Sequence, residues 1–374
     1  MDNTPPVIPL VRPLRANMDL VEAMLNSKPD PYTLSNYGYL HRKVEKELES
    51  FTGRPSLPLA TGTAALQIAV WLHCKPGTRV AIPDFTHVGT LQAVVNAHCI
   101  PVLFPCNKTT WQIDPMALQA EHKAYDAVIV VSPFGYRVET EYYDALMRKM
   151  RKQVIYDFAG SWGHFPHTAN PVCYSLHATK NLSCGEGGVL AVTSPSLKEM
   201  AQRTSNFQNL PDRQIYSPYG NNFKIDEYKA AIILAVLLGS LWRERMENKK
   251  ETLMHYAKEF AASGLHIPQA ATIGFPSLCA FEGFPDARAA EVELVQQGIQ
   301  ARAYYPLLSK MDGLKTLPRV GEGSSAMFET VVALPGDVSP PERDRICLAV
   351  QKLVIEQRAR AKEMEAAKPS SSPA

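Results

Sequence analysis

The sequence lacks an excess of charge of one sign and any ordered cysteine pattern. Lys and Arg total 39 and Asp and Glu total 37 in 374 residues, so the formal net charge is only +2. A nucleic-acid partner is therefore not expected, because binding phosphates over a surface depends on a strong positive field. The seven cysteines are scattered, without a CxxC pair or a Cys/His cluster, which argues against zinc and against a disulfide framework. We expect no metal and a reducing, cytoplasmic environment.

Long hydrophobic runs are also missing. The longest mainly apolar stretch, AAIILAVLLGSLW at 230–242, has 13 residues and is bounded by Lys229 and Arg243. Spanning a bilayer takes about 20 residues, so the stretch predicts a buried helix and no membrane partner. The first ten residues, MDNTPPVIPL, do not show the basic region and apolar core of a signal peptide.

Apolar periodicity indicates alternating helices and strands. Spacings of three and four predict an amphipathic helix over 40–51 that ends near Gly53, and a second helix over 65–72 that begins at 62–63. Between and after them lie short β-rich runs at 80–82, 100–104, 127–131, 154–156 and 189–192. Near-continuous apolar strands separated by helices predict an α/β fold with a parallel sheet covered on both faces.

A change in composition predicts two domains. The helical pattern from Asp226 to about Phe260 is apolar at first and then strongly charged. We expect a large domain over 1–245, including an N-terminal arm, and a smaller α+β domain over 246–365. Residues 366–374 have no apolar anchor and are expected to form a disordered tail.

The most informative segment is 155–189. Asp157 directly follows a β-rich run, which predicts a position at the carboxyl end of a strand, where doubly wound sheets bind ligands. Lys180 follows 23 residues later, after Ser175 and before a glycine-rich stretch. This order suits pyridoxal phosphate (PLP). The lysine amine forms the Schiff base with the aldehyde, and the carboxylate keeps the pyridine nitrogen protonated.

The segment TGTAAL at 61–66 predicts a phosphate site. Gly62 allows close approach of an anion to the backbone, and a helix N-terminus offers free N–H groups. The hydroxyls of Thr63 and Ser175 could complete the site. Each of these signals alone is common in proteins without a cofactor, so the interpretation depends on their order and spacing.

The chain resembles the DegT/DnrJ/EryC1/StrS family of sugar aminotransferases, within the fold-type I PLP enzymes. The resemblance is carried by LATGTAAL (59–66), YDFAGSWG (156–163), YSLHATKNLSCGEGG (174–188) and YGNNFKIDEYKAA (219–231). It implies an aspartate-aminotransferase-like fold, with a large α/β domain around a mostly parallel sheet and a smaller C-terminal α+β domain. It also implies transfer of an amino group from L-glutamate, or another amino acid, to a keto-sugar, for which attachment to a nucleotide is expected.

The resemblance assigns roles to single positions. Lys180 would be the Schiff-base lysine and the acid/base that moves the proton, and Asp157 would pair with the pyridine nitrogen. Asn222 matches an asparagine that reaches the phosphate of the neighbouring subunit, which implies a homodimer with shared active sites. The cofactor-binding residues implied in this way are Gly62, Thr63, His87, Asp157, Ser175, Lys180 and Asn222.

Three positions depart from the family pattern. Gly160 stands where members usually carry Gln or His against the cofactor's ring oxygen, His87 where an aromatic ring usually stacks on the cofactor, and Lys224 where Arg is usual. Because of Gly160, the alternative function is a PLP enzyme of the same fold that catalyses elimination, dehydration or carbon–carbon chemistry. A non-catalytic sensor or scaffold is a third hypothesis, which the intact Asp157 and Lys180 disfavour.

Aromatic residues supply candidates for the substrate pocket. Trp162 and His164 follow the cofactor aspartate closely, and Tyr304 and Tyr305 could face a sugar ring with an apolar body and a polar tip. Ordinary packing is the alternative for each of them. The sequence leaves these two interpretations open.

Overall fold

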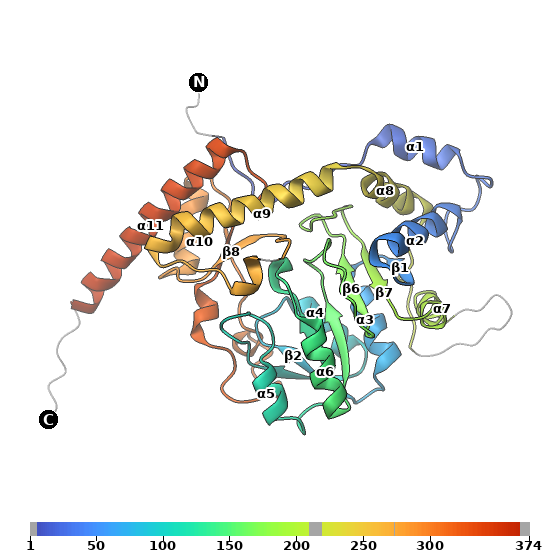
Figure 1. Ribbon diagram of the computed structural model, residues 1–374, viewed down its shortest axis with the longest axis horizontal. Helices are drawn as coiled ribbons and strands as arrows, with labels where there is room; N and C mark the ends of the chain where they lie inside the picture. The colour runs from blue at the N-terminus through green and yellow to red at the C-terminus, as the bar shows by residue number, and fades with distance from the viewer. Residues whose placement is uncertain (1–5, 209–218, 273, 367–374) are drawn as a thin grey trace.

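The computed structural model describes residues 6–208, 219–272 and 274–366 (Figure 1). Most of the predicted tail, residues 367–374, lies outside this range. The helices are α1 (Met18–Asn26), α2 (Tyr39–Thr52), α3 (Gly62–His73), α4 (Val88–Asn96), α5 (Pro115–Ala120), α6 (Thr140–Met150), α7 (Pro195–Thr204), α8 (Glu227–Leu238), α9 (Leu241–Phe260), α10 (Ala287–Gln296) and α11 (Pro340–Ala366). The strands are β1 (Ser56–Leu59), β2 (Arg79–Pro83), β3 (Ile100–Phe104), β4 (Ala127–Val131), β5 (Gln153–Asp157), β6 (Val172–Ser175), β7 (Gly188–Ala191), β8 (Cys279–Phe281), β9 (Arg302–Ala303) and β10 (Val332–Leu334).

Seven strands form one sheet in the order β1-β7-β6-β5-β4-β2-β3. From β6 to β3 all neighbours are parallel, whereas β7 runs antiparallel to both β6 and β1. The predicted α/β class and mostly parallel sheet are therefore confirmed. The predicted strand at 189–192 exists, but it is antiparallel, and β1 and β6 are additional strands that periodicity did not reveal.

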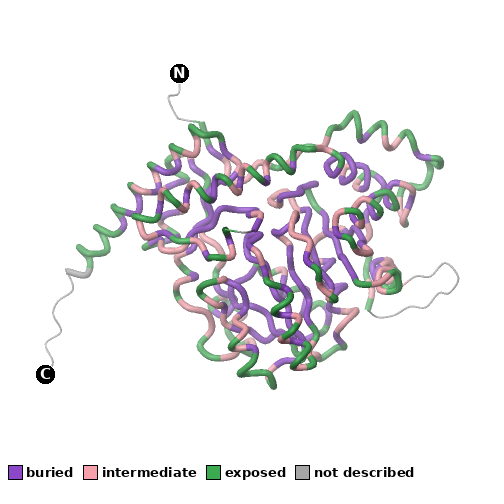
Figure 2. Tube along the Cα trace, in the orientation of Figure 1, coloured by how far each residue is buried: buried purple, intermediate pink, exposed green. Residues whose placement is uncertain are grey.

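Both faces of this sheet are buried, as Figure 2 shows by the purple strands at its centre. On β4, Val128 and Val130 belong to a core shared with α2, α6 and α8, whereas Ala127 and Ile129 belong to a core shared with α3 and α4. Successive side chains of a strand point to opposite faces, so a strand covered on both sides needs apolar residues at every position. This explains the near-continuous apolar runs in the sequence.

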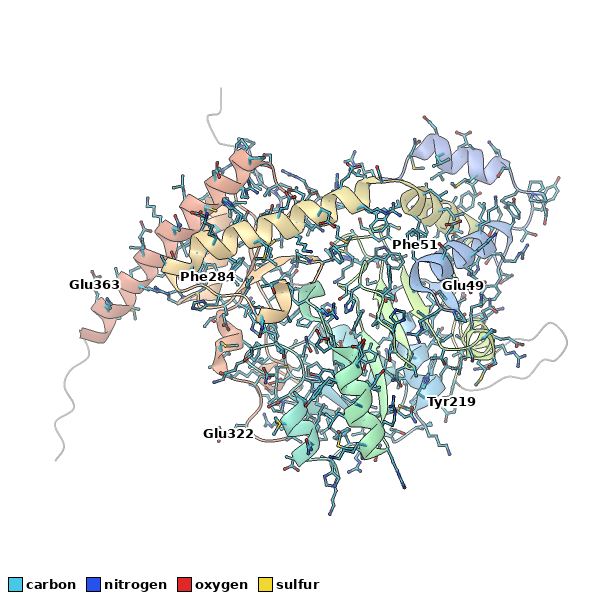
Figure 3. The ribbon with its side chains drawn as sticks, viewed as in Figure 1. Glu49, Phe51, Tyr219, Phe284, Glu322 and Glu363 are labelled. Carbon is cyan, nitrogen blue, oxygen red and sulfur yellow. The ribbon has the colours of Figure 1, made fainter. Side chains whose placement is uncertain are left out.

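A second, three-stranded antiparallel sheet, β8-β10-β9, packs with α9, α10 and α11. Helix α9 runs from the helices of the large sheet to this smaller one (Figure 1). At its start Trp242 contacts Phe51 with ring centroids 5.8 Å apart, and the other end shares a core with Phe284 (Figure 3). Residue 245 lies inside α9, and the division into domains there stays a prediction.

The predicted helix over 226–260 is two helices. Helix α8 ends at Leu238 and α9 begins at Leu241, with Gly239 as the C-cap of α8. Among the described residues no helix is long and apolar enough to cross a membrane, and no group of three His, Cys, Asp or Glu side chains could hold a metal. All seven cysteines are buried and free.

Helix α8 fixes the start of α2 through a buried carboxylate. The side chain of Glu227 is fully buried, and its two oxygens accept hydrogen bonds from the N–H groups of Leu40 and His41, each at 2.9 Å. These N–H groups lie in the first turn of α2, where no intrahelical acceptor exists. The capping residue, Gly38, has no side chain to take this role, and an added Cβ would lie 2.6 Å from the Glu227 carboxyl carbon.

We therefore expect Glu227→Ala to lower the free energy of unfolding by about 2 kcal/mol, because two buried N–H groups lose their acceptor. Chemical denaturation followed by circular dichroism measures this change. The control is Glu22→Ala, the same substitution at an exposed position of α1. Equal stability of the two variants would contradict the capping role.

Candidate active site

Asp157 is the last residue of β5, at the carboxyl edge of the large sheet. Its carboxylate is 8% exposed and accepts hydrogen bonds from Thr90 Oγ1 at 2.9 Å and from the Ala159 N–H at 3.1 Å. Burial raises the pKa of this carboxyl, because loss of water disfavours the charged form and the two donors compensate only in part. The geometry therefore favours a ligand that brings a positive charge to Asp157.

Lys180 lies in the loop between β6 and β7, half-buried, with its backbone N–H bonded to the His177 carbonyl at 2.8 Å. Loss of water lowers the pKa of its amine, and the charge of nearby Asp157 opposes this shift. Within the described part of the chain no hydrogen-bond acceptor is found for Lys180 Nζ. The amine is thus available to a ligand, and a lowered pKa increases its nucleophilic, neutral fraction.

The start of α3, packed against the end of β6, is the candidate anion site. An added Cβ on Gly62 would lie 2.8 Å from Ser175 Cβ, so the helix start and the end of β6 come together only because residue 62 is glycine. Thr61 caps α3 through the Ala64 N–H, which leaves the N–H groups of Gly62 and Thr63 without an acceptor among the described residues. Free N–H groups at a helix N-terminus bind phosphate well.

His87 is the N-cap of α4, and its Nδ1 accepts a hydrogen bond from the Gly89 N–H at 3.0 Å. Burial lowers the pKa of the imidazole, and the Lys180 charge lowers it further, so the neutral ring is favoured. An added Cβ on Gly89 would be 3.0 Å from His87 Nδ1 and 3.1 Å from Thr63 Oγ1. His87 therefore lies beside the anion site as well as within the electrostatic reach of Lys180 and Asp157.

The tyrosines of the smaller sheet lie at the edge of this group. The Tyr305 ring is 6.2 Å from the His87 ring, in an edge-to-face arrangement, and stacks on Phe134 at 5.2 Å. Tyr304 contacts Tyr305 at 5.0 Å and lies below the Arg302 guanidinium. Both tyrosines are half-buried, so the structure places them where a ligand beyond His87 could contact them.

These residues fit PLP on the observations given above. Asp157 is buried with only neutral donors bonded to it in the described chain, which suits a protonated pyridine nitrogen, and the Lys180 amine suits the aldehyde. The start of α3, with its two available N–H groups and the Thr63 and Ser175 hydroxyls, suits the phosphate.

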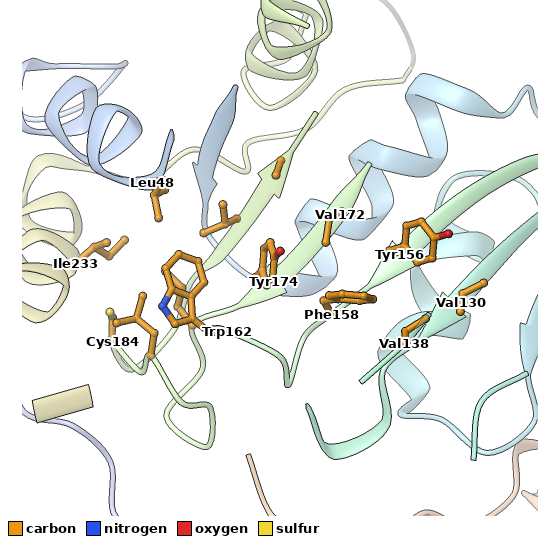
Figure 4. Close-up of a cluster of buried hydrophobic side chains, with 14 of the residues drawn as sticks. Leu48, Val130, Val138, Tyr156, Phe158, Trp162, Val172, Tyr174, Cys184 and Ile233 are labelled. Carbon is orange, nitrogen blue, oxygen red and sulfur yellow. The ribbon is translucent and has the colours of Figure 1, made fainter. Parts of the chain in front are cut away.

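Trp162 does not belong to this group. Its side chain is 1% exposed and packs against the rings of Phe165, Tyr174 and Trp242, deep in the core drawn in Figure 4. Its position five residues after Asp157 suggested the substrate pocket, but the indole is buried among other aromatic rings. The structure supports the packing interpretation, and we leave Trp162 out of the proposed site.

His164 also lies elsewhere. Its ring stacks on Phe158 at 5.3 Å, and burial lowers the pKa of the imidazole. The charged groups that act on it are Arg137, Glu139 and Glu141, not Lys180 or Asp157. A substrate contact through His164 is therefore not supported.

Asn222 is exposed and accepts a hydrogen bond from Lys224 Nζ at 2.5 Å. Among the described residues it makes no hydrogen bond to Gly62, Thr63 or Ser175 of its own chain. The next residue, Phe223, accepts a hydrogen bond from the Ala60 N–H at 2.8 Å, so the segment that carries Asn222 lies beside the one that leads into α3.

Close packing explains why residue 160 is glycine. An added Cβ would lie 2.9 Å from the Gly135 nitrogen and 3.0 Å from Ser277 Oγ. Three loops meet here, and any side chain would push them apart. The usual Gln or His of the resemblance has no space in this chain.

Sequence reasoning missed Thr90, which holds Asp157, and Asn181, which is buried beside Lys180. A signal for Thr90 was present, since it is a polar residue among the apolar positions of α4. Asn181 gave no such signal, because its partners come from distant parts of the chain.

Comparison with known proteins agrees with this geometry. Residues 16–351 match the model of the DegT/DnrJ/EryC1/StrS aminotransferase family. The chain is 28% identical over 327 residues to Protein Rv3402c of Mycobacterium tuberculosis, covering 81% of this chain and 77% of that protein. It is 29% identical over 345 residues to the dTDP-4-amino-4,6-dideoxy-D-glucose transaminase of Shigella dysenteriae, covering 87% and 92%.

A solved structure of DesI in the presence of its TDP-sugar product has the same fold, with a TM-score of 0.83, 21% identity and 97% of each chain covered. The family suggested by the motifs is therefore confirmed. The chain belongs to the DegT/DnrJ/EryC1/StrS aminotransferase family and is a PLP-dependent aminotransferase.

Proposed function

We propose that this enzyme transfers an amino group from L-glutamate to a nucleotide-linked keto-sugar, with PLP attached to Lys180. The observation that carries the proposal is the meeting of Lys180, Asp157 and the start of α3 at one edge of the sheet. The name of the Shigella relative, a dTDP-sugar transaminase, and the TDP-sugar product seen with DesI support a nucleotide-linked sugar as the acceptor.

When bound, PLP supplies an electrophilic aldehyde and a ring that withdraws electrons from the substrate carbon. Asp157 is the residue that would pair with the pyridine nitrogen, and a charge-assisted hydrogen bond to this buried carboxylate would keep that nitrogen protonated. Thr90 and the Ala159 amide fix the direction of that carboxylate. The N–H groups of Gly62 and Thr63, with the Ser175 hydroxyl, would hold the phosphate.

Lys180 also moves the proton. Its amine would hold and move the proton between the donor carbon and the cofactor when PLP is bound. Loss of water around Lys180 lowers the pKa of the amine, which makes a base of this kind more effective near neutral pH. In this proposal His87 would stack on the cofactor, and Tyr304 and Tyr305, of which Tyr305 contacts the His87 ring, would contact the sugar.

Lys180→Ala is expected to abolish the visible absorption of lysine-linked PLP and to reduce turnover by about a thousandfold or more, since both linkage and proton transfer are lost. The absorption spectrum of the purified protein measures the linkage, and the rate at which this spectrum changes after addition of L-glutamate measures the first half of the turnover. Lys180→Arg is the matched control, because it keeps a positive charge but cannot form the linkage.

Wild-type protein should lose its visible absorption when L-glutamate converts the cofactor. A visible band that persists in Lys180→Ala would contradict the assignment of the lysine. A wild-type spectrum that does not respond to glutamate or other amino acids would favour the elimination, dehydration or carbon–carbon alternative.

We also propose a homodimer in which Asn222 completes the phosphate site of the partner subunit. Asn222→Ala should then retain PLP less well, and a mixture of Lys180→Ala and Asn222→Ala subunits should regain activity. Each site of the proposed dimer takes Lys180 from one subunit and Asn222 from the other. In a mixed dimer one site therefore contains both substitutions, while the other site has native Lys180 and native Asn222.

Activity after mixing and re-associating the two variants measures this complementation, with each variant alone as the control. If both residues served the same chain's site, each site of the mixed dimer would carry one substitution. Activity no higher than the average of the separate variants would then contradict the shared site.

A further inference from the structure

A second lysine is buried close to the proposed cofactor lysine. Lys249, on α9, is 8% exposed, although Lys side chains are rarely buried without a partner. Loss of water lowers the pKa of its amine to about 8, and the charge of Lys180 adds to that effect. The charge of Lys180 thus opposes protonation of Lys249.

The acceptor of Lys249 Nζ is Asn181 Oδ1, at 3.1 Å. Asn181 is 3% exposed, and its Nδ2 donates to the Phe275 carbonyl at 3.0 Å. Both ends of this amide are thus held inside the protein. Because Asn181 directly follows Lys180, a fixed Asn181 side chain limits how the Lys180 backbone can move.

The charged and titratable groups that act on Lys249 come from four places. Asp337, in the loop before α11, attracts the ammonium, but it is also bonded to Asn248 Nδ2 at 3.0 Å and lies 3.4 Å from Arg245 Nε. Arg245, one turn earlier on α9, repels it, as does Lys180. Cys279 on β8 is buried, which raises the pKa of its thiol to about 12 and keeps it neutral. Asp337 is the only carboxylate among the described groups that act on Lys249, and it is shared with Arg245, so it does not fully compensate the charge of the lysine.

We propose that Lys249 is a positioning residue of the active site: it holds the Asn181 side chain and adds a positive charge beside the Lys180 segment. The inference rests on the proposed role of Lys180. The charge disfavours a proton on the Lys180 nitrogen, and the hydrogen bond keeps the residue after it in place. A buried methionine would fill the same space without either effect, so packing alone does not require a lysine here.

The charge can be tested on the holoenzyme. In the holoenzyme the Lys180 nitrogen would be attached to the cofactor aldehyde, and Lys249 carries its proton at pH values below its pKa of about 8. Removing a nearby positive charge makes protonation of that nitrogen easier and moves its titration to higher pH. The probe is the visible absorption of bound PLP as a function of pH, which does not depend on turnover.

Lys249→Met removes the charge and the hydrogen bond, whereas Lys249→Gln removes the charge but keeps a donor for Asn181. We expect both to move the midpoint of the spectral titration upward by about half a pH unit or more. Lys249→Arg keeps the charge and should leave the midpoint near that of wild type. Lys258→Met, at an exposed position of the same helix, is the matched control.

Midpoints of Lys249→Met and Lys249→Gln equal to that of wild type would overturn the inference, even if the variants were less stable. If Lys249→Met fails to fold, the comparison of Lys249→Gln with Lys249→Arg still decides the question. Failure of the proposed function is seen separately, because Lys180→Ala would then keep the lysine-linked absorption.

Discussion

A buried carboxylate at the end of β5 has to be stabilised where little water reaches it. Thr90 and the Ala159 amide provide two neutral hydrogen bonds to Asp157, and these offset only part of the cost of burial. A protonated pyridine nitrogen would supply the missing positive charge. The parallel arrangement of β4, β5 and β6 matters for this reason, since it brings Asp157 and Ser175 to the same edge as the start of α3.

The smaller sheet is tied to that edge by another buried carboxylate. Asp84, just after β2, accepts hydrogen bonds from the Ser309 N–H and hydroxyl, each at 2.8 Å, and from the Ser324 N–H at 3.0 Å. Its neighbour Phe85 contacts Phe328 with ring centroids 4.6 Å apart. The loop that carries Tyr305 is thereby held next to His87.

Much of the fold could be predicted from local patterns. The helices α2 and α3 and the strands β2 to β5 appear where periodicity placed them, because each has a repeating apolar face or a buried apolar run. The four-residue strands β1 and β6 are too short to show a period. Helix α8 ends at Gly239 inside an apolar run, and hydrophobicity alone could not show this break.

The sequence by itself determined the family and the PLP dependence, and it predicted the residues at the cofactor end of the site. Asp157, Lys180 and Gly62 belong to short motifs whose geometry depends mainly on neighbouring residues, so their chemistry could be inferred from order and spacing. Only the tertiary structure decided that Trp162 is a core residue, that Gly160 has no room for a side chain, and that Lys249 reaches Asn181 across 68 positions. These facts depend on which distant segments pack together, and one-dimensional spacing does not encode that packing.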